Sequence, residues 1–295
     1  MEVFNYWLYF NQNITIPNYR MLFFPNAKIN IGLNVINKRS DGYHNIETVF
    51  CPIGLSDVLE FVYLPGIRAG SVSFSITGIP VEGPHESNLC VKAYNILNRD
   101  FTLPAIAIHL HKIVPPGSGL GGGSSDAAFM LKNLNVQFEL KLDEDQLCDY
   151  ASRLGSDCAF FIKNRPIFGY ERGNSFREIE LFPGYFDIVV INPGIHISTS
   201  EAYSGVRKGI PAQPLEELVN LPVEQWRGQI INDFEGSIIK KHPVIDDIKN
   251  KLYKLGAVYA SMSGSGSSVY GLFSEKAPAV EDQFPGFFCW SGPMV

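Results

Sequence analysis

Hydrophobic and polar residues alternate strictly near the start of the chain, over residues 27–35. A period of two is typical of a β-strand, whose successive side chains point to opposite faces. The apolar face carries Ile29, Ile31, Leu33 and Val35. The opposite face carries Lys28, Asn30 and Asn34. Taken alone, this segment predicts a strand whose polar face is an ordinary solvated edge.

The same pattern analysis predicts further strands and helices along the chain. Apolar runs predict strands at residues 58–64, 71–76, 106–110, 186–192, 257–262 and 267–273. Amphipathic segments predict helices at residues 88–98, 127–134, 143–154, 229–240 and 244–255. Ser124, Ser125 or Asp126 is the expected cap of the second of these helices. A sensible domain boundary lies only around residues 164–173.

A glycine-rich segment joins the strand predicted at residues 106–110 directly to the next helix. Glycines let successive backbone N–H groups face one point, and the first turn of a helix adds unpaired donors and the positive end of its dipole. The segment therefore predicts a phosphate-binding loop. Its residues are Pro116, Gly117, Ser118, Gly119, Leu120, Gly121, Gly122, Gly123, Ser124 and Ser125.

Other interpretations of this loop compete. Gly117, Gly119 and Gly122 satisfy G-x-G-x-x-G, and Glu139 lies near the offset of a ribose-binding acid, so an NAD-dependent oxidoreductase is an alternative. Pro115 and Pro116, which stiffen the strand exit, and the high glycine density count against that interpretation. No Gly-Lys-Ser/Thr follows, which excludes a Walker A loop. A flexible linker is disfavoured because the loop lies between a strand and an apolar helix.

Two other segments are ambiguous on their own. Tyr43 and His44 follow a turn-rich stretch and either grip a flat ring or pack locally. Asp157 lies among small and apolar residues, where an unpaired charge is costly, but it also suits the cap of a short helix. Local sequence favours the cap.

Composition sets outer limits on the function. The 295 residues are 45% hydrophobic and carry a net charge of −6, which argues against nonspecific nucleic-acid or anionic-membrane binding. Five scattered cysteines without Cys-x-x-Cys spacing suggest neither a disulfide framework nor a zinc site, and fit a reducing cytoplasm. Residues 1–20 match neither a signal peptide nor a membrane span and are expected to be a dispensable extension.

Three segments taken in order resemble the signatures of the GHMP small-molecule kinases: residues 25–33, 116–128 and 261–268. Residues 39–44, 155–161 and 232–235 are similar to the members that act on a cytidine-diphosphate-linked methylerythritol. The order and separations of these segments are more specific than any one of them. Ser156 stands where those members often have alanine, and residues 1–20 have no counterpart.

The resemblance implies an α+β, two-domain GHMP-kinase fold. Residues 21–165 would form an ATP-binding and catalytic domain of S5-like βαβ architecture, and residues 166–295 a ferredoxin-like substrate-binding domain. It also implies transfer of the ATP γ-phosphoryl group to the substrate 2-hydroxyl with Mg²⁺, with ATP phosphates in the glycine loop. A different GHMP kinase, of mevalonate or homoserine type, is the nearer alternative.

The resemblance also implies roles for individual residues. Asp157 matches the catalytic base and Lys28 its partner lysine. The expected substrate-binding residues are Asn30, Tyr43, His44, Thr199, Tyr203, Gly264 and Gly266. The two tyrosines offer stacking faces to the cytosine. Ser124 and Ser125 are expected to touch either Mg²⁺ or phosphate, and no metal ligand is assigned. The expected partner is a small molecule only, for a cytoplasmic monomer or weak homodimer without nucleic-acid or membrane partners.

Overall fold

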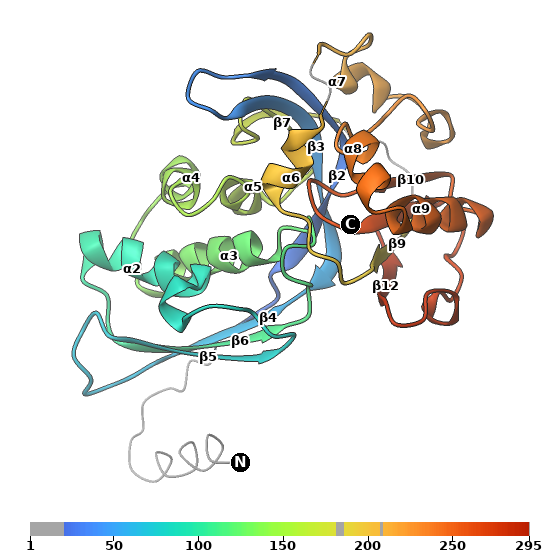
Figure 1. Ribbon diagram of the computed structural model, residues 1–295. Coiled ribbons are helices and arrows are strands. Elements are labelled where there is room, and N and C mark those ends of the chain that lie inside the picture. The colour runs from blue at the N-terminus through green and yellow to red at the C-terminus, as the bar shows by residue number, and fades with distance from the viewer. Residues whose placement is uncertain (1–20, 181–185, 207–208, 295) are drawn as a thin grey trace.

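The computed structural model describes residues 21–180, 186–206 and 209–294, which form three four-stranded sheets (Figure 1). The expected extension, residues 1–20, lies outside the described residues. Among the helices of the described part, none combines the length and the apolar character that crossing a bilayer requires.

The first sheet and its helices carry the glycine loop. Its strand order is β1 (Met21–Phe23), β4 (Val58–Tyr63), β6 (Ile106–Lys112) and β5 (Val72–Gly78). Strands β5 and β6 are parallel and are joined through α2 (Leu89–Phe101), which makes a βαβ unit. Helices α2 and α3 (Gly122–Gln137) cover one face of this sheet (Figure 1). The glycine loop connects β6 to α3.

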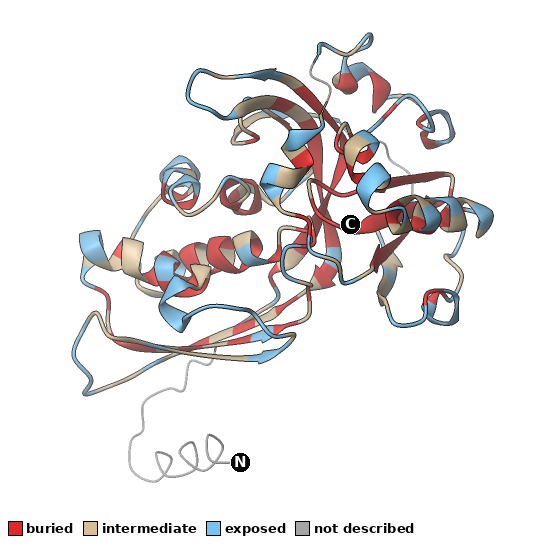
Figure 2. Ribbon diagram, viewed as in Figure 1, coloured by how far each residue is buried: buried red, intermediate tan, exposed pale blue. Residues whose placement is uncertain are grey.

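The second sheet is antiparallel and carries Lys28 and Asn30. Its order is β2 (Asn26–Lys38), β3 (His44–Ser56), β7 (Ile167–Tyr170) and β8 (Ser175–Glu178). The solvated edge expected for β2 is wrong: Lys28 and Asn30 are each 2% exposed. The strand is buried on both faces along most of its length (Figure 2), because the glycine loop and the C-terminal half of the chain cover its polar side.

The third sheet has the strand order of a ferredoxin-like domain. The order is β10 (Tyr259–Met262), β11 (Val269–Phe273), β9 (Asp187–Asn192) and β12 (Phe288–Pro293), with every pair antiparallel. Helix α9 (Val244–Lys254) packs on β10 and β11. Between β11 and β12 the described chain forms only a short 3-10 turn, η4 (Glu281–Gln283).

Shorter elements complete the chain. Helices α4 (Glu144–Ser152) and α5 (Cys158–Lys163) lie beside α3, and η2 (His85–Ser87) precedes α2. The C-terminal half adds α6 (Thr199–Ser204), α7 (Leu215–Leu218), η3 (Val223–Gln225) and α8 (Glu235–Lys241). The domain division at residues 165 and 166 stays a prediction. Strands β7 and β8, which follow that point, extend the sheet of β2 and β3.

Two local expectations differ from the structure. Helix α3 begins after Gly121, which has φ +73° and no side chain to cap with, so all three expected caps, Ser124, Ser125 and Asp126, lie inside the helix. The helix expected at residues 229–240 begins only at Glu235, because the Asn232 side chain accepts the N–H of Phe234 and holds this segment in another conformation. The helix expected at residues 143–154 is present as α4, and a capping box between Asp143 and Gln146 starts it.

Candidate active site

The glycine loop is held in place by β2. The backbone N–H of Lys28 donates to the carbonyl oxygen of Leu120 at 2.9 Å, and the Lys28 ammonium donates to the carbonyl oxygen of Gly119, also at 2.9 Å. A strand of the second sheet thus fixes a loop of the first. Because the loop carbonyls are turned to Lys28, backbone N–H groups on the other side remain available to an anion.

A second loop, residues 263–268 between β10 and β11, braces the glycine loop. The hydroxyl of Ser263 donates to the Gly119 carbonyl at 3.0 Å, and the N–H of Ser268 donates to the Ser118 carbonyl at 3.0 Å. Gly264 lies beside the Lys28 and Asn30 side chains, where a Cβ would approach Asn30 Oδ1 at 3.1 Å. The glycine loop and the 263–268 loop therefore form one structural unit.

Lys28 and Asp157 meet at one end of this unit. The Lys28 Nζ atom lies 3.4 Å from Oδ2 of Asp157, with side-chain exposures of 3% and 34% respectively. Burial lowers the pKa of Lys28, and the charge of Asp157 opposes that shift. Asp157 stands at the N-cap position of α5 but makes no capping bond. The interpretation of Asp157 as a helix cap is therefore wrong, because its side chain faces Lys28 and not the backbone N–H groups of α5.

Asn30 holds Lys28 in place. Its Oδ1 atom accepts a hydrogen bond from Lys28 Nζ at 2.5 Å, and its Nδ2 atom donates to Oγ1 of Thr48 at 3.0 Å. Both groups of this amide are thus engaged within the protein. A buried ammonium requires such partners, since an unpaired charge in the interior is costly.

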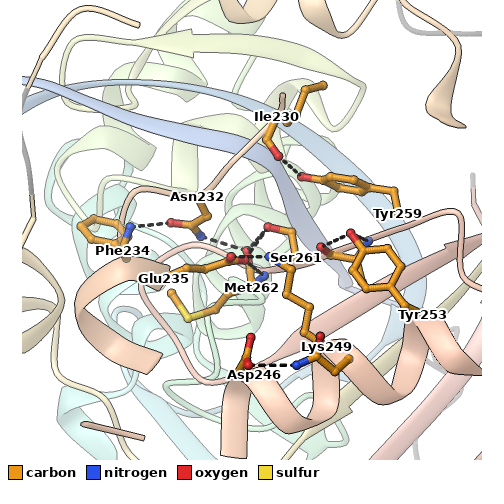
Figure 3. A network of polar contacts seen from close by, with 12 residues as sticks. Ile230, Asn232, Phe234, Glu235, Asp246, Lys249, Tyr253, Tyr259, Ser261 and Met262 are labelled. Carbon is orange, nitrogen blue, oxygen red and sulfur yellow. Dashed lines mark hydrogen bonds and ion pairs between the residues drawn. The ribbon is translucent and has the colours of Figure 1, made fainter. Parts of the chain in front are cut away.

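A network from the 232–235 segment fixes the 263–268 loop (Figure 3). The Asn232 amide donates to the carbonyl oxygens of Met262 and Gly264, at 2.9 and 2.8 Å. The Glu235 carboxylate accepts from Ser261 Oγ at 2.9 Å and from the Met262 N–H at 2.8 Å, and pairs with Lys249 at 2.5 Å. The 232–235 segment, which resembles a family motif, thus uses its polar side chains to bind the 263–268 loop and the end of β10.

The same segment also reaches β2. The carboxylate of Asp233 accepts the N–H of Val35 at 2.7 Å, and the backbone of Asp233 donates to the Leu33 carbonyl at 2.8 Å. Leu33 also forms an isolated parallel bridge with Asn232. The strand that carries Lys28 and the loop that braces the glycines are therefore positioned by four consecutive residues.

A pocket of about 220 Å³ opens beside the glycine loop. Its walls are mostly apolar and include Phe74, Ile76, Asn88, Leu89, Pro116 and Asp126. Its polar lining residues are Glu82, His85, Ser87, Asn88, Lys112 and Asp126. Small-molecule sites typically combine apolar walls with a limited number of such polar groups. Gly117 and Gly123 of the loop also line it, so the pocket is continuous with the predicted phosphate site.

A buried ionic cluster lies behind the loop. The Lys112 ammonium pairs with Asp57 and, at 3.0 Å, with Asp126. Burial would lower the pKa of Lys112, but the two carboxylates outweigh it and raise that pKa. Burial raises the pKa of Asp126 to about 7, against the opposing charge of Lys112. Asp57 also accepts the N–H groups of Ile113 and Val114, which fixes the strand exit before the loop.

Three buried polar atoms at the loop lack a hydrogen-bond partner in the described part of the chain. They are Ser118 Oγ, Ser125 Oγ and Asp126 Oδ1. Such atoms are costly unless a ligand or water satisfies them, so they suit a polar ligand in the loop. Within the described residues, no group of three or more His, Cys, Asp or Glu side chains is arranged to hold a metal ion.

Three residues expected at the cytidine end meet at α6: His44, Thr199 and Tyr203. The rings of His44 and Tyr203 stack with centroids 4.4 Å apart at 15°, and Phe234 meets Tyr203 edge-on at 4.8 Å. Tyr43 is 53% exposed, and the Arg172 guanidinium lies 3.8 Å from its ring centroid. Thr199 is exposed at the start of α6. The face of Tyr203 that was expected to stack on the cytosine is therefore in contact with the His44 ring.

Sequence reasoning missed several residues at this site. A Cβ on Gly117 would lie 3.5 Å from Nδ1 of His196, which places that histidine beside the loop. Lys112 and Arg172 were also missed. Lys112 has a weak local signal, a lysine on a strand that leads into the loop, whereas Arg172 and His196 lie far from any motif in sequence.

Comparison with known proteins agrees with this geometry. Residues 88–165 match the family model of the GHMP kinases N terminal domain, and residues 215–288 that of the GHMP kinases C terminal domain. A 4-diphosphocytidyl-2-C-methyl-D-erythritol kinase of Bacteroides thetaiotaomicron is 50% identical over 277 residues, covering 93% of this chain and 100% of that protein. One of Bacteroides fragilis is 47% identical over 270 residues, covering 92% and 98%. A crystal structure of 4-(cytidine 5'-diphospho)-2C-methyl-D-erythritol kinase has a TM-score of 0.77 at 29% identity, covering 92% and 98%.

Proposed function

This chain belongs to the 4-diphosphocytidyl-2-C-methyl-D-erythritol kinase family of the GHMP kinases. We propose that it transfers the γ-phosphoryl group of ATP to the 2-hydroxyl of 4-diphosphocytidyl-2-C-methyl-D-erythritol. This reaction is a step of the non-mevalonate route to isopentenyl diphosphate. The observation that carries the proposal is the Lys28–Asp157 pair, with its nitrogen and oxygen 3.4 Å apart at the end of a braced glycine loop. The alternative of an NAD-dependent oxidoreductase is set aside by the family membership.

Asp157 orients the acceptor hydroxyl and takes its proton. It is one-third exposed, so its carboxylate is open to a ligand, while its Lys28 contact keeps it in one direction. Phosphoryl transfer requires aligned reactants and stabilised phosphoryl oxygens more than a strong base. Lys28 supplies positive charge where the transferred group passes. Asn30 serves by holding Lys28, and its direct contact with the substrate stays a prediction.

The nucleotide occupies the glycine loop and the adjoining pocket. Residues 116–125 cradle the phosphates with backbone N–H groups and the start of α3. The apolar pocket of about 220 Å³ takes the base, with Asn88 as a polar contact. The chain carries a net charge of −6, so anionic substrates depend on these local donors and on the nearby lysine.

The start of α3 offers oxygen atoms that suit Mg²⁺. Magnesium usually binds through substrate phosphates, waters and one or two protein oxygens rather than a full protein cage. The unpartnered Ser125 hydroxyl and the neighbouring Ser124 at the start of α3 offer such oxygens. The ion would neutralise charge on the phosphates.

The cytidylated end of the substrate binds between the 43–44 turn and α6. Tyr43 supplies an exposed aromatic face, Tyr203 supports the His44 ring by stacking on it, and His44 reads the base edge. Thr199 and the backbone of Gly264 and Gly266 complete the binding residues. The aromatic contacts are remote from the reacting hydroxyl and so give binding energy without chemistry. We place the enzyme in the cytoplasm, as a monomer or weak homodimer that needs no nucleic-acid or membrane partner.

A coupled assay of ADP release tests this function. The purified chain is offered the cytidylated methylerythritol, mevalonate, phosphomevalonate, homoserine and galactose in parallel. We expect turnover with the cytidylated substrate and no comparable rate with the other four. A preference for mevalonate or homoserine would reject the proposed substrate but leave the assignment as a GHMP kinase. ADP release that does not depend on any acceptor would reject the kinase assignment.

A further inference from the structure

We propose that Arg172 is a positioning residue for the cytidylated substrate: its guanidinium supports one face of the Tyr43 ring and thereby orients the other face for the cytosine. The inference rests on the proposed function, because it needs a flat base on Tyr43. It concerns a residue in the turn between β7 and β8, which is remote in sequence from the 43–44 turn.

The turn that carries Arg172 is fastened to the strand that follows Tyr43. Glu171 has φ +57°, and its carbonyl oxygen accepts the N–H of Ile46 at 2.6 Å. Gly173 closes the turn by donating to the Tyr170 carbonyl at 3.0 Å. A Cβ on Gly173 would lie only 3.2 Å from Cδ1 of Ile46. The backbone on both sides of Arg172 is therefore fixed against β3, three residues beyond Tyr43.

The Arg172 guanidinium lies over the Tyr43 ring and forms no ion pair with a carboxylate of the described residues. Its central carbon lies 3.8 Å from the Tyr43 centroid, and its Nε atom is buried without a hydrogen-bond partner among the described residues. Asp41, in the turn before Tyr43, interacts electrostatically with Arg172, but its carboxylate hydrogen-bonds to Arg39 at 3.0 Å and accepts the Tyr43 N–H at 3.1 Å. The flat cation thus lies over the aromatic face, a contact that arginine geometry favours.

This arrangement leaves a usable surface. Tyr43 remains 53% exposed although Arg172 lies over its ring at van der Waals distance, so much of the side chain stays accessible to a ligand. Asp41 fixes the backbone of Tyr43 and Arg172 fixes its ring. A ring that is already ordered loses less side-chain entropy when a base stacks on it. Arg172 therefore favours binding of the cytidylated substrate without touching the reacting groups.

The test compares Arg172→Met with the wild-type chain in the coupled assay. Methionine keeps an aliphatic side chain of similar reach but loses the flat cation. We expect the KM for the cytidylated substrate to rise roughly three- to tenfold, with kcat and the KM for ATP unchanged. The matched control is Arg153→Met, which removes a guanidinium 5.0 Å from the Tyr150 ring on α4 and should leave all three constants unchanged. A wild-type KM in Arg172→Met, or an equal rise for ATP, would overturn the inference.

A double-mutant cycle with Tyr43→Ala separates positioning from direct contact. If Arg172 acts through Tyr43, Arg172→Met should cause no further rise in the Tyr43→Ala background. An equal rise in both backgrounds would mean that Arg172 acts independently of the ring, against the proposal. The wild-type chain reports on the proposed function by itself: inactivity with the cytidylated substrate would reject that function, whereas wild-type activity with unchanged Arg172→Met kinetics would reject only the role of Arg172.

Discussion

Gly119 and Gly266 are packed against each other so closely that neither has room for a side chain. A Cβ on Gly266 would lie 2.1 Å from the backbone nitrogen of Gly119, and a Cβ on Gly119 would lie 2.1 Å from the Ser263 carbonyl oxygen. We therefore predict that Gly266→Ala pushes the two loops apart. Overpacking costs about 1–3 kcal/mol, so ATP affinity measured by calorimetry should fall by about tenfold or more.

Gly236→Ala is the matched control for that variant. Gly236 lies inside α8, where an added Cβ would meet nothing within 4 Å, and alanine is the better helix former there. The control should keep its ATP affinity and show an equal or higher melting temperature. Wild-type ATP affinity in Gly266→Ala would contradict the close packing of the two loops.

Asp157→Asn tests the proposed base. The amide keeps the shape of the carboxylate but cannot accept the hydroxyl proton, so kcat should fall on the order of 10²- to 10⁴-fold. Calorimetry should show both ligands still binding, because Asp157 is partly exposed and caps no helix through its side chain. A variant with near-wild-type turnover would remove Asp157 from the chemistry and leave Lys28 as the group to examine.

The sequence predicted the helices and strands better than it predicted which of their side chains are buried and what those side chains contact. The alternation around Lys28 located β2, yet it favoured a solvated edge, because a single strand cannot reveal that loops from both halves of the chain cover its polar face. Asp157 looked like a helix cap locally, and only the fold brings Lys28 to it. The resemblance to the GHMP kinases supplied what local pattern could not.

Other features depended on contacts between distant segments. The helix expected from residue 229 starts late because Asn232 and Asp233 use their side chains on the 263–268 loop and on β2. Strands β7, β8 and β12 are short and gave no clear alternation. Arg172 carries no motif and is recognisable only through its position over Tyr43.

Asn232→Asp tests the network behind the 263–268 loop. An aspartate cannot donate to the Met262 and Gly264 carbonyls and would face them with negative charge. Leaving buried acceptors unpaired costs about 1–3 kcal/mol, so we expect a lower melting temperature together with a raised KM for ATP. The control is Asn250→Ala on the exposed side of α9, which removes an amide that binds Asp246 without adding a charge and should leave the KM for ATP unchanged. A loss of stability with an unchanged KM for ATP would limit Asn232 to a structural role.

The raised pKa of Asp126 predicts a pH dependence of stability. Burial places that pKa at about 7 in the folded chain, against an ordinary value of 3.8. Between these values the folded chain binds more protons than the unfolded chain, so this group makes the free energy of unfolding fall as the pH rises from about 4 to about 7, and no further above that. Asp126→Asn removes the titration, while Asp57 remains as partner of Lys112.

Urea unfolding of both chains at several pH values checks this prediction. The difference in free energy of unfolding between Asp126→Asn and wild type should move in favour of the variant as the pH rises through that window, and should stay constant above about 7. Curves that run parallel from about pH 4 to about pH 8 would show that Asp126 is not the group whose pKa is raised.

Tyr203 offers the sharpest test of where the two substrates lie. Its ring stacks on His44 at 4.4 Å and meets the edge of Phe234, so alanine would remove a stacking surface and the support of His44 together. By analogy with base stacking on aromatic side chains, worth about 1–3 kcal/mol, Tyr203→Ala should raise the KM for the cytidylated substrate about tenfold or more. Tyr203→Phe keeps the ring and should be nearly silent. Tyr63→Ala, which removes a half-exposed tyrosine at the end of β4, is the control and should change neither KM. A rise confined to the KM for ATP would show that the nucleotide, not the cytidylated substrate, adjoins α6, and would reverse the proposed placement of the two ligands.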